Sequence, residues 1–287
     1  MTAARHDRDG FASRETGIDD AAFRRLAAIL QGECGIVLSE SKKSLAVSRL
    51  SRRLRNLNLP DFARYCDLLE SPDGQEERRE MVCLLTTNVT NFFRESHHFE
   101  ALKSEVLPPL LDKAKRGERV RLWSAGCSSG QEPYSIAMTL LEAFPDIRRH
   151  DVRILATDID TRMVQTGKEG LYRDLDKAHV SPERRSRFFD ARPGESGVWA
   201  AKPALRDLVT FAELNLIRDW PMSGPFDVIF CRNVVIYFDA ETQSRLWTRF
   251  SQILRPGGYL FVGHSERVSG PATSGLNLTG TTQYLKS

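Results

Sequence analysis

The sequence predicts an α/β fold in which a mostly parallel, doubly wound sheet follows a small all-helical domain. Helical periodicity without strand-like runs extends from residue 18 to residue 85. Beyond residue 100, short apolar runs alternate with amphipathic helical stretches, a pattern typical of a parallel sheet with both faces covered. The alternation breaks at 171–208, where turn residues and short apolar stretches predict an inserted small subdomain.

Composition changes divide the chain into four parts. Residues 1–17 are polar with little to bury, and we expect a disordered tail. Residues 18–85 form the expected helical domain, which we expect to dock a partner. Residues 86–100 link it to the second domain, 101–287.

Glycine, proline and turn residues separate the expected elements. In the first domain Phe23, Leu26, Ala27 and Leu30 share one helix face, and Pro60 ends a later helix. The helices expected here cover about 18–32, 44–58, 61–69 and 75–85. The strands expected in the second domain are 120–127, 152–160, 209–216, 226–233 and 259–266, with an antiparallel edge strand at 281–287. Its expected helices are 133–144, one from 161, and 240–254.

Charge and cysteine content exclude several classes of protein. The net charge of +3 is too small to indicate nucleic-acid binding by itself. The five cysteines are far apart and form no CxxC pair or zinc-type spacing, which predicts reduced thiols and no metal site. His97-His98 lacks further ligands at matched spacing. No apolar run is long enough for a signal peptide or a membrane span, so we expect a cytoplasmic protein without membrane insertion.

The strongest local signal lies at 122–135, LWSAGCSSGQEPYS, where a buried strand enters a turn of small residues before a helix. Gly126 and Gly130 allow positive φ and close approach of a ligand, and the helix N-terminus offers free N–H groups. Asp158 ends the next strand, where a carboxylate suits ribose hydroxyls. This pattern predicts a nucleotide-type cofactor, and the absence of G-x-G-x-x-G argues against a dinucleotide. A plain βα turn remains the alternative.

Polar side chains also follow the next two strands, with Asn215 after one and Arg232 and Asn233 after the other. Tyr237 lies just beyond, either as a core aromatic or as a site residue. The carboxyl ends of parallel strands meet at one edge of the sheet, which is where such sheets bind ligands.

Five segments in this order, TTNVTNFFRE, SAGCSSGQEPYS, ATDID, FCRNVVIYF and LRPGGYLFVGHSE, closely resemble the CheR-type family of chemotaxis receptor glutamate O-methyltransferases. The resemblance covers about 18–287. It implies a Rossmann-like S-adenosylmethionine-dependent methyltransferase fold with an all-α N-terminal domain and an inserted β-subdomain. It also implies methylation of glutamate γ-carboxylates, with S-adenosylhomocysteine as the second product.

The resemblance implies roles for individual residues. Arg94 and Tyr237 would flank the reacting methyl group. Together with Gly126 from the turn, the cofactor-binding residues would be Asn88, Thr90, Arg94, Glu132, Asp158, Asn215, Leu216, Arg232 and Asn233. A carboxylate nucleophile is already ionised at neutral pH, so no general base is required. Arg94 would orient a carboxylate, and Tyr237 would donate one hydrogen bond to it or shape the path of the methyl group.

A basic stripe is expected on the second helix, where Arg49, Arg52, Arg53 and Arg55 lie opposite the apolar face. It is either a solvated face or a docking surface for an acidic partner, the methylation helices of a receptor. RNA is disfavoured because no aromatics interleave with the arginines. We expect a monomer, and the insertion at 171–208 is a candidate site for a receptor's C-terminal tail peptide. The alternatives are a methyltransferase of the same fold acting on nucleic acid or another protein, and a non-catalytic cofactor-binding signalling module.

Overall fold

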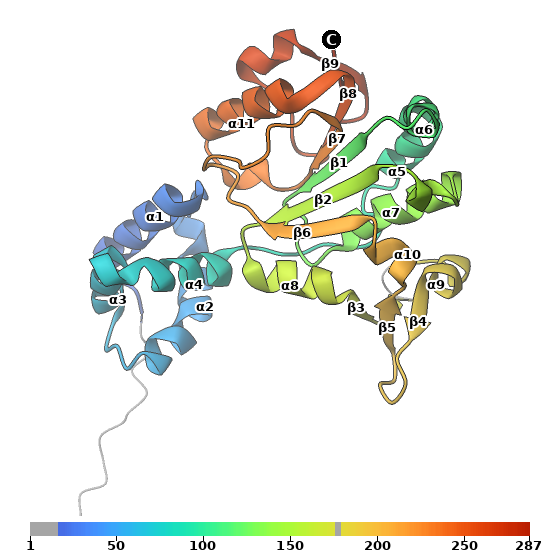
Figure 1. The fold of residues 1–287 in the computed structure, drawn as a ribbon. Helices are drawn as coiled ribbons and strands as arrows, with labels where there is room; N and C mark the ends of the chain where they lie inside the picture. Colours follow the sequence, from blue (N-terminus) through green and yellow to red (C-terminus); the bar gives the residue numbers. More distant parts are fainter. Residues whose placement is uncertain (1–16, 176–178) are drawn as a thin grey trace, which may run out of the picture. The chain divides into compact units, whose positions relative to one another are not determined.

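The computed structural model describes residues 17–175 and 179–287, so the predicted tail at 1–17 lies outside the described residues except for Gly17. The described chain forms two compact units (Figure 1). Unit 1 contains residues 17–32 and 38–85, and unit 2 contains 33–37 and the described residues from 86 to 287.

Unit 1 is a small helical bundle. Leu26, Leu50, Leu54 and Tyr65 are completely buried in it or nearly so, as the helical spacing predicts. The side chain of Asp61 accepts a hydrogen bond from the main chain of Arg64 and caps the third helix. The helices are α1 (Asp20–Cys34), α2 (Lys43–Asn56), α3 (Phe62–Glu70) and α4 (Gln75–Leu85).

One segment departs from the predicted boundary. Glu33–Val37 belongs to unit 2 rather than to the helical domain expected at 18–85. Its main chain is bonded there, because Asn215 Nδ2 donates to the carbonyl of Glu33 over 2.7 Å and the N–H of Val37 donates to the carbonyl of Tyr237 over 2.8 Å. These partners lie about 200 residues away along the chain, and periodicity within a short window cannot reveal them.

Unit 2 is built on a seven-stranded sheet with the order β6-β2-β1-β7-β8-β10-β9. The first five strands in this order are parallel, and β10 is antiparallel to both β8 and β9. The doubly wound, mostly parallel fold is therefore confirmed. The strands are β1 (Val120–Ala125), β2 (Val152–Asp158), β6 (Val209–Glu213), β7 (Phe226–Cys231), β8 (Leu254–Val262), β9 (Leu276–Gly280) and β10 (Gln283–Lys286).

The prediction that the C-terminal strand lies at the edge is wrong. β10 pairs with β8 on one side and with β9 on the other, so β9 is the edge strand. The segment that forms β9 has one buried residue, Leu276, followed by exposed ones, which gives it no strand-like apolar run.

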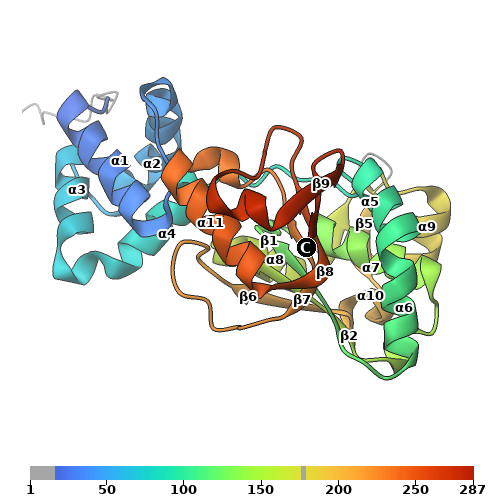
Figure 2. The ribbon, with the colours of Figure 1, turned by 90° about the horizontal axis from the view of Figure 1, so that it is seen from above.

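Neighbouring residues of the central strands point to opposite faces of the sheet. Leu122 and Val228 pack in the core formed with the helices α5, α6 and α7, whereas Trp123 and Ile229 pack in the core formed with α11 (Figure 2). Buried apolar residues cover both faces of the sheet, which explains why β7 is buried along its whole length. The helices are α5 (His97–Ala101), α6 (Leu107–Lys115), α7 (Gln131–Ala143), α8 (Thr161–Glu169) and α11 (Ala240–Ile253).

The predicted insertion folds as a three-stranded antiparallel sheet with the order β3-β5-β4. Its strands are β3 (Leu171–Arg173), β4 (Phe189–Ala191) and β5 (Val198–Ala201), with the helices α9 (Pro182–Phe188) and α10 (Pro203–Arg206) beside them in the chain. Among the described residues, no helix is long and apolar enough to cross a membrane.

Candidate active site

The turn after β1 is shaped by glycine, as the sequence predicts. Gly126 has a φ of 82°, and a Cβ atom there would lie 2.4 Å from Cγ2 of Val234, so no other residue fits without displacing the turn after β7. The N–H groups of Gly126 and Cys127 both donate to the carbonyl of Thr157. The ends of β1, β2 and β7 therefore meet closely at one edge of the sheet.

Asp158 is buried at the end of β2 and is held by the main chain. The N–H of Ser128 donates to its Oδ2 over 2.7 Å, and the N–H of Asp160 donates to its Oδ1 over 3.0 Å. Burial raises the pKa of Asp158, and these N–H groups oppose that shift. Each carboxylate oxygen has a second lone pair, so both oxygens can still accept a hydroxyl group, as binding of a ribose requires.

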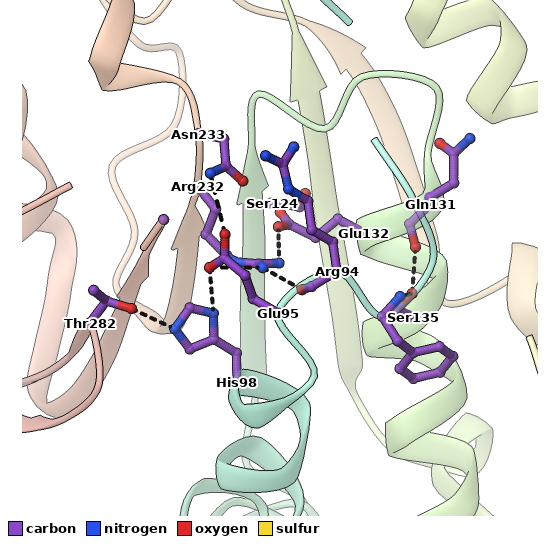
Figure 3. Close-up of polar contacts among 12 residues, drawn as sticks. Arg94, Glu95, His98, Ser124, Gln131, Glu132, Ser135, Arg232, Asn233 and Thr282 are labelled. Atoms are coloured by element: carbon purple, nitrogen blue, oxygen red, sulfur yellow. Dashed lines mark hydrogen bonds and ion pairs between the residues drawn. The ribbon is translucent and has the colours of Figure 1, made fainter. Parts of the chain in front are cut away.

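Glu132 and Arg232 form the centre of a buried ionic network (Figure 3). Arg232 Nη1 donates to Glu132 Oε2 over 2.9 Å, and Ser124 Oγ donates to the other carboxylate oxygen over 2.7 Å. Arg232 Nη2 lies 3.2 Å from Oε2 of Glu95 and also donates to the carbonyl of Arg94. The guanidinium thus binds the side chains of Glu132 and Glu95 and the main chain of Arg94, and these contacts fix the linker next to α7.

The linker reaches the same strand ends. Asn88 Nδ2 donates to Asp160 Oδ2 over 2.8 Å, and the carbonyl of Asn88 accepts a hydrogen bond from Ser128 Oγ over 2.9 Å. Arg94 is half-buried and donates from Nη1 to the carbonyl of Val89 over 3.0 Å. Thr90, between them, is also half-buried. The predicted linker residues therefore lie next to the turns that hold Asp158 and Glu132.

The turn after β7 carries Asn233 and Tyr237. Asn233 has a φ of 59°, and its Nδ2 donates to Glu95 Oε1 over 3.3 Å. Tyr237 is half-buried at the end of the 3-10 helix Val235–Tyr237. Both residues thus belong to one short turn at the site edge of the sheet.

Asn215 and Leu216 follow β6. The side chain of Asn215 donates to the carbonyl of Glu33 and accepts from the N–H of Ile217 over 3.1 Å, and Leu216 is buried. In this arrangement both residues shape the loop after β6. Their predicted contacts with a cofactor stay a prediction.

Sequence reasoning missed Glu95, Asp160 and Glu266. Burial alone would raise the pKa of Glu95, but the charge of Arg232 and hydrogen bonds from His264, Arg232 and Asn233 lower it to about 2. Glu95 follows Arg94 in NFFRE and Asp160 ends ATDID, so both lay within segments already singled out. Glu266 ends LRPGGYLFVGHSE and so also lay within such a segment, but three of its four bonds are to N–H groups about 30 positions earlier, which no local pattern reveals.

Glu95, His97 and His98 bring three possible metal-ligand atoms within 4.8 Å of one another. Burial, followed by the charge of Arg232, lowers the pKa of His98 to about 3, so its ring is neutral. Its Nε2 bonds to Thr282 Oγ1 over 2.9 Å. Because the fixed charge of Arg232 lies 3.2 Å from the same Glu95 oxygen that would face a cation, we interpret this cluster as part of the ionic network.

Two of the four arginines in the predicted basic stripe on α2 are bonded to other groups of unit 1. Arg53 forms a bidentate pair with the buried carboxylate of Glu77, with Nη2 at 2.5 Å and Nε at 3.0 Å, and Tyr65 donates to the same carboxylate. Arg49 donates to the carbonyl of Leu85 over 3.0 Å. Arg52 and Arg55 remain exposed on α2. A helical wheel of α2 cannot show these partners, because Glu77 and the carbonyl of Leu85 belong to α4.

Comparison with known proteins identifies the family of this chain. The family model described as "CheR methyltransferase, SAM binding domain" matches residues 88–285. The one described as "CheR methyltransferase, all-alpha domain" matches residues 21–86. A protein of Rhizobium etli named "Probable chemotaxis protein methyltransferase" is 48% identical over 257 residues, covering 89% of this chain and 96% of that protein.

Two enterobacterial proteins named "Chemotaxis protein methyltransferase" are also similar. The one from Escherichia coli is 42% identical and covers 88% of this chain and 86% of its own length. The one from Salmonella typhimurium is 40% identical and covers 95% of this chain and 92% of its own length. With both domains matched and the strand-end site in place, the chain belongs to the CheR methyltransferase family, and its cofactor is S-adenosylmethionine.

Proposed function

We propose that this protein transfers the methyl group of S-adenosylmethionine to glutamate side chains of chemotaxis receptors, forming glutamate methyl esters and S-adenosylhomocysteine, for sensory adaptation. The observation that carries the proposal is the set of polar groups at one edge of the sheet, with Asp158 at the end of β2, Glu132 in the first turn of α7 and Arg94 in the linker. The names of the relatives support chemoreceptors as the substrate class.

The residues at this edge fit the cofactor. Asp158 keeps an accepting lone pair on each oxygen for the two ribose hydroxyls. Glu132 is an acidic group held in place by Ser124 and Arg232, and it suits the cofactor's ammonium group. Asn88, which bonds to Asp160 and Ser128, would border the ribose from the linker together with Thr90, and Asn215, Leu216 and Asn233 would complete the proposed pocket.

When bound, S-adenosylmethionine supplies an electrophilic methyl group on a sulfonium. The substrate glutamate is already ionised, so the protein needs to position it rather than deprotonate it. Arg94 is half-buried, and the fork of N–H groups beyond its bond to Val89 suits a carboxylate. Tyr237 would donate a single hydrogen bond, which orients the nucleophile without neutralising it. Exclusion of water favours the step, because opposite charges are lost as it proceeds.

Two surfaces fit the proposed partner. Arg52 and Arg55 are exposed on α2 and suit an acidic receptor helix, so unit 1 is the proposed docking domain. The small sheet β3-β5-β4 has two outer strands, each paired on one side only, and such an edge suits an extended tail peptide. We further propose that the protein acts in the cytoplasm as a monomer.

The experiment that tests the proposal is methyl transfer to receptor-containing membranes, using cofactor labelled in its methyl group. We expect label on the receptor that mild base releases as methanol, because carboxyl methyl esters are base-labile. Label that resists base would point to another acceptor class, and cofactor binding without any transfer would point to a non-catalytic module. Membranes whose receptors carry glutamine at the methylated positions serve as the control.

A further inference from the structure

Glu266 follows β8 and is only 2% exposed. Its carboxylate accepts four main-chain hydrogen bonds. Oε2 accepts from the N–H groups of Gly263, over 2.6 Å, and Asn233, over 2.9 Å. Oε1 accepts from the N–H groups of Val234, over 2.8 Å, and Val235, over 2.9 Å. One side chain thus binds the ends of two neighbouring strands, β7 and β8.

These four bonds determine the shape of the turn after β7. Three of the donors are consecutive N–H groups at the start of the 3-10 helix Val235–Tyr237, where a helix has no acceptors of its own. They hold Asn233 at its positive φ of 59°. A Cβ atom on Gly263 would lie 2.8 Å from Glu266 Oε2 and 2.7 Å from the N–H nitrogen of Asn233, so this packing also requires glycine.

The same turn supports the residues at the site. Val234 packs against Gly126 in the turn after β1, and Asn233 reaches Glu95 in the linker. Tyr237 ends the 3-10 helix that the carboxylate caps. We propose that Glu266 is a positioning residue for methyl transfer, which holds Asn233 and Tyr237 in register with the cofactor-binding ends of β1 and β2. This inference rests on the proposed function and adds a residue to it.

The arrangement requires a carboxylate rather than an amide. Each oxygen faces two N–H donors, so a glutamine in either orientation would direct its own NH2 group at two of them. Two buried donors would then lose their acceptor, and the turn would have to move. An aspartate keeps both oxygens but is one methylene shorter.

The test compares E266Q with D227N in the full-length protein. Asp227 is a matched control because it is also a buried carboxylate on this framework, at the opposite end of β7. It accepts from Lys113 Nζ, Arg255 Nη1 and the N–H of Arg121, each over 2.7 Å. Both variants lose a buried, hydrogen-bonded carboxylate. Of the two carboxylates, only that of Glu266 contacts the turn that carries Tyr237.

Kinetic constants for receptor methylation are measured on each protein, with active protein counted by its stoichiometry of S-adenosylhomocysteine binding. We expect kcat of E266Q to fall about 100-fold, as for a misplacement on the ångström scale. We expect kcat of D227N to stay within about threefold of the wild type, although both variants melt at lower temperature. Equal kcat for E266Q and the wild type overturns the inference, and so does an equal loss in D227N.

E266D provides a second test if E266Q does not fold. An intermediate loss of kcat in E266D supports the positioning role, whereas full activity overturns it. Failure of the proposed function looks different, because the wild-type protein itself would then transfer no methyl group to receptors.

Discussion

Arg232 Nη1 lies 2.9 Å from Glu132 Oε2, and the side chains are only 2% and 12% exposed. The same guanidinium faces Glu95 at 3.2 Å, so one cation compensates two buried acids. The pKa of Glu132 is raised by burial, which Arg232 and Ser124 oppose. Removal of the arginine would leave both acids buried without a cation.

R232M should therefore lower the free energy of unfolding by about 3–5 kcal/mol and weaken cofactor binding. Chemical denaturation measures the first effect and calorimetric titration the second. R116M is the control, since Arg116 forms an exposed pair with Glu118 and should change stability by less than about 1 kcal/mol. Equal stabilities of R232M and R116M would contradict the account of the network.

The buried ring of His98 predicts a pH dependence of stability. Its pKa is lowered from 6.5 to about 3, mainly by burial. Below pH 6.5 the unfolded chain binds a proton at this residue that the folded protein does not, so stability falls as the pH is lowered from 6.5 towards 3. We expect H98Q to show a shallower loss across this window in denaturation at a series of pH values. Parallel curves for the two proteins would show that His98 titrates normally.

Substitution of Arg94 or Tyr237 should lower activity without disturbing the fold. Both are half-buried, and we expect R94A and Y237F to fold with melting temperatures close to that of the wild type. R94A should lose about 100-fold in kcat/KM for the receptor, and Y237F about tenfold, because the two residues orient the substrate carboxylate. Steady-state methylation assays provide the measurement. Near-normal turnover by R94A would remove Arg94 from the mechanism.

The two pairs of arginines on α2 should behave differently. R52E/R55E should raise KM for receptor membranes about tenfold at low salt, less at high salt, and leave kcat unchanged. R49A/R53A should act mainly on stability, because Arg53 neutralises the buried Glu77 and Arg49 bonds to the end of α4. An unchanged KM in R52E/R55E at low salt would exclude α2 as the docking surface.

The sequence predicted the parts of the fold that local patterns encode. The strands β1, β2 and β7 were found from apolar runs, and Asp158, Arg232 and Asn233 from their positions at strand ends. The resemblance added the linker residues Asn88 and Arg94. These features depend on residues that are close together in the chain.

The features that were missed depend on distant partners. β9 carries little apolar signal and is a strand only because it pairs with β10. Three of the four N–H groups that bind Glu266 belong to the turn after β7, about 30 positions earlier, and the acid that pairs with Arg53 lies 24 residues away. Neither the periodicity nor the composition of a segment contains such pairings.

The central claim is that Asp158, at the end of β2, and Glu132, in the first turn of α7, hold S-adenosylmethionine. Calorimetric titration with S-adenosylhomocysteine tests it most directly, on the wild-type protein and on D158N. We predict one site per chain, weakened about 100-fold in D158N because hydrogen bonds to a charged acceptor are lost. A wild-type protein that binds neither S-adenosylhomocysteine nor S-adenosylmethionine, or a D158N variant that binds as tightly as the wild type, would contradict the account.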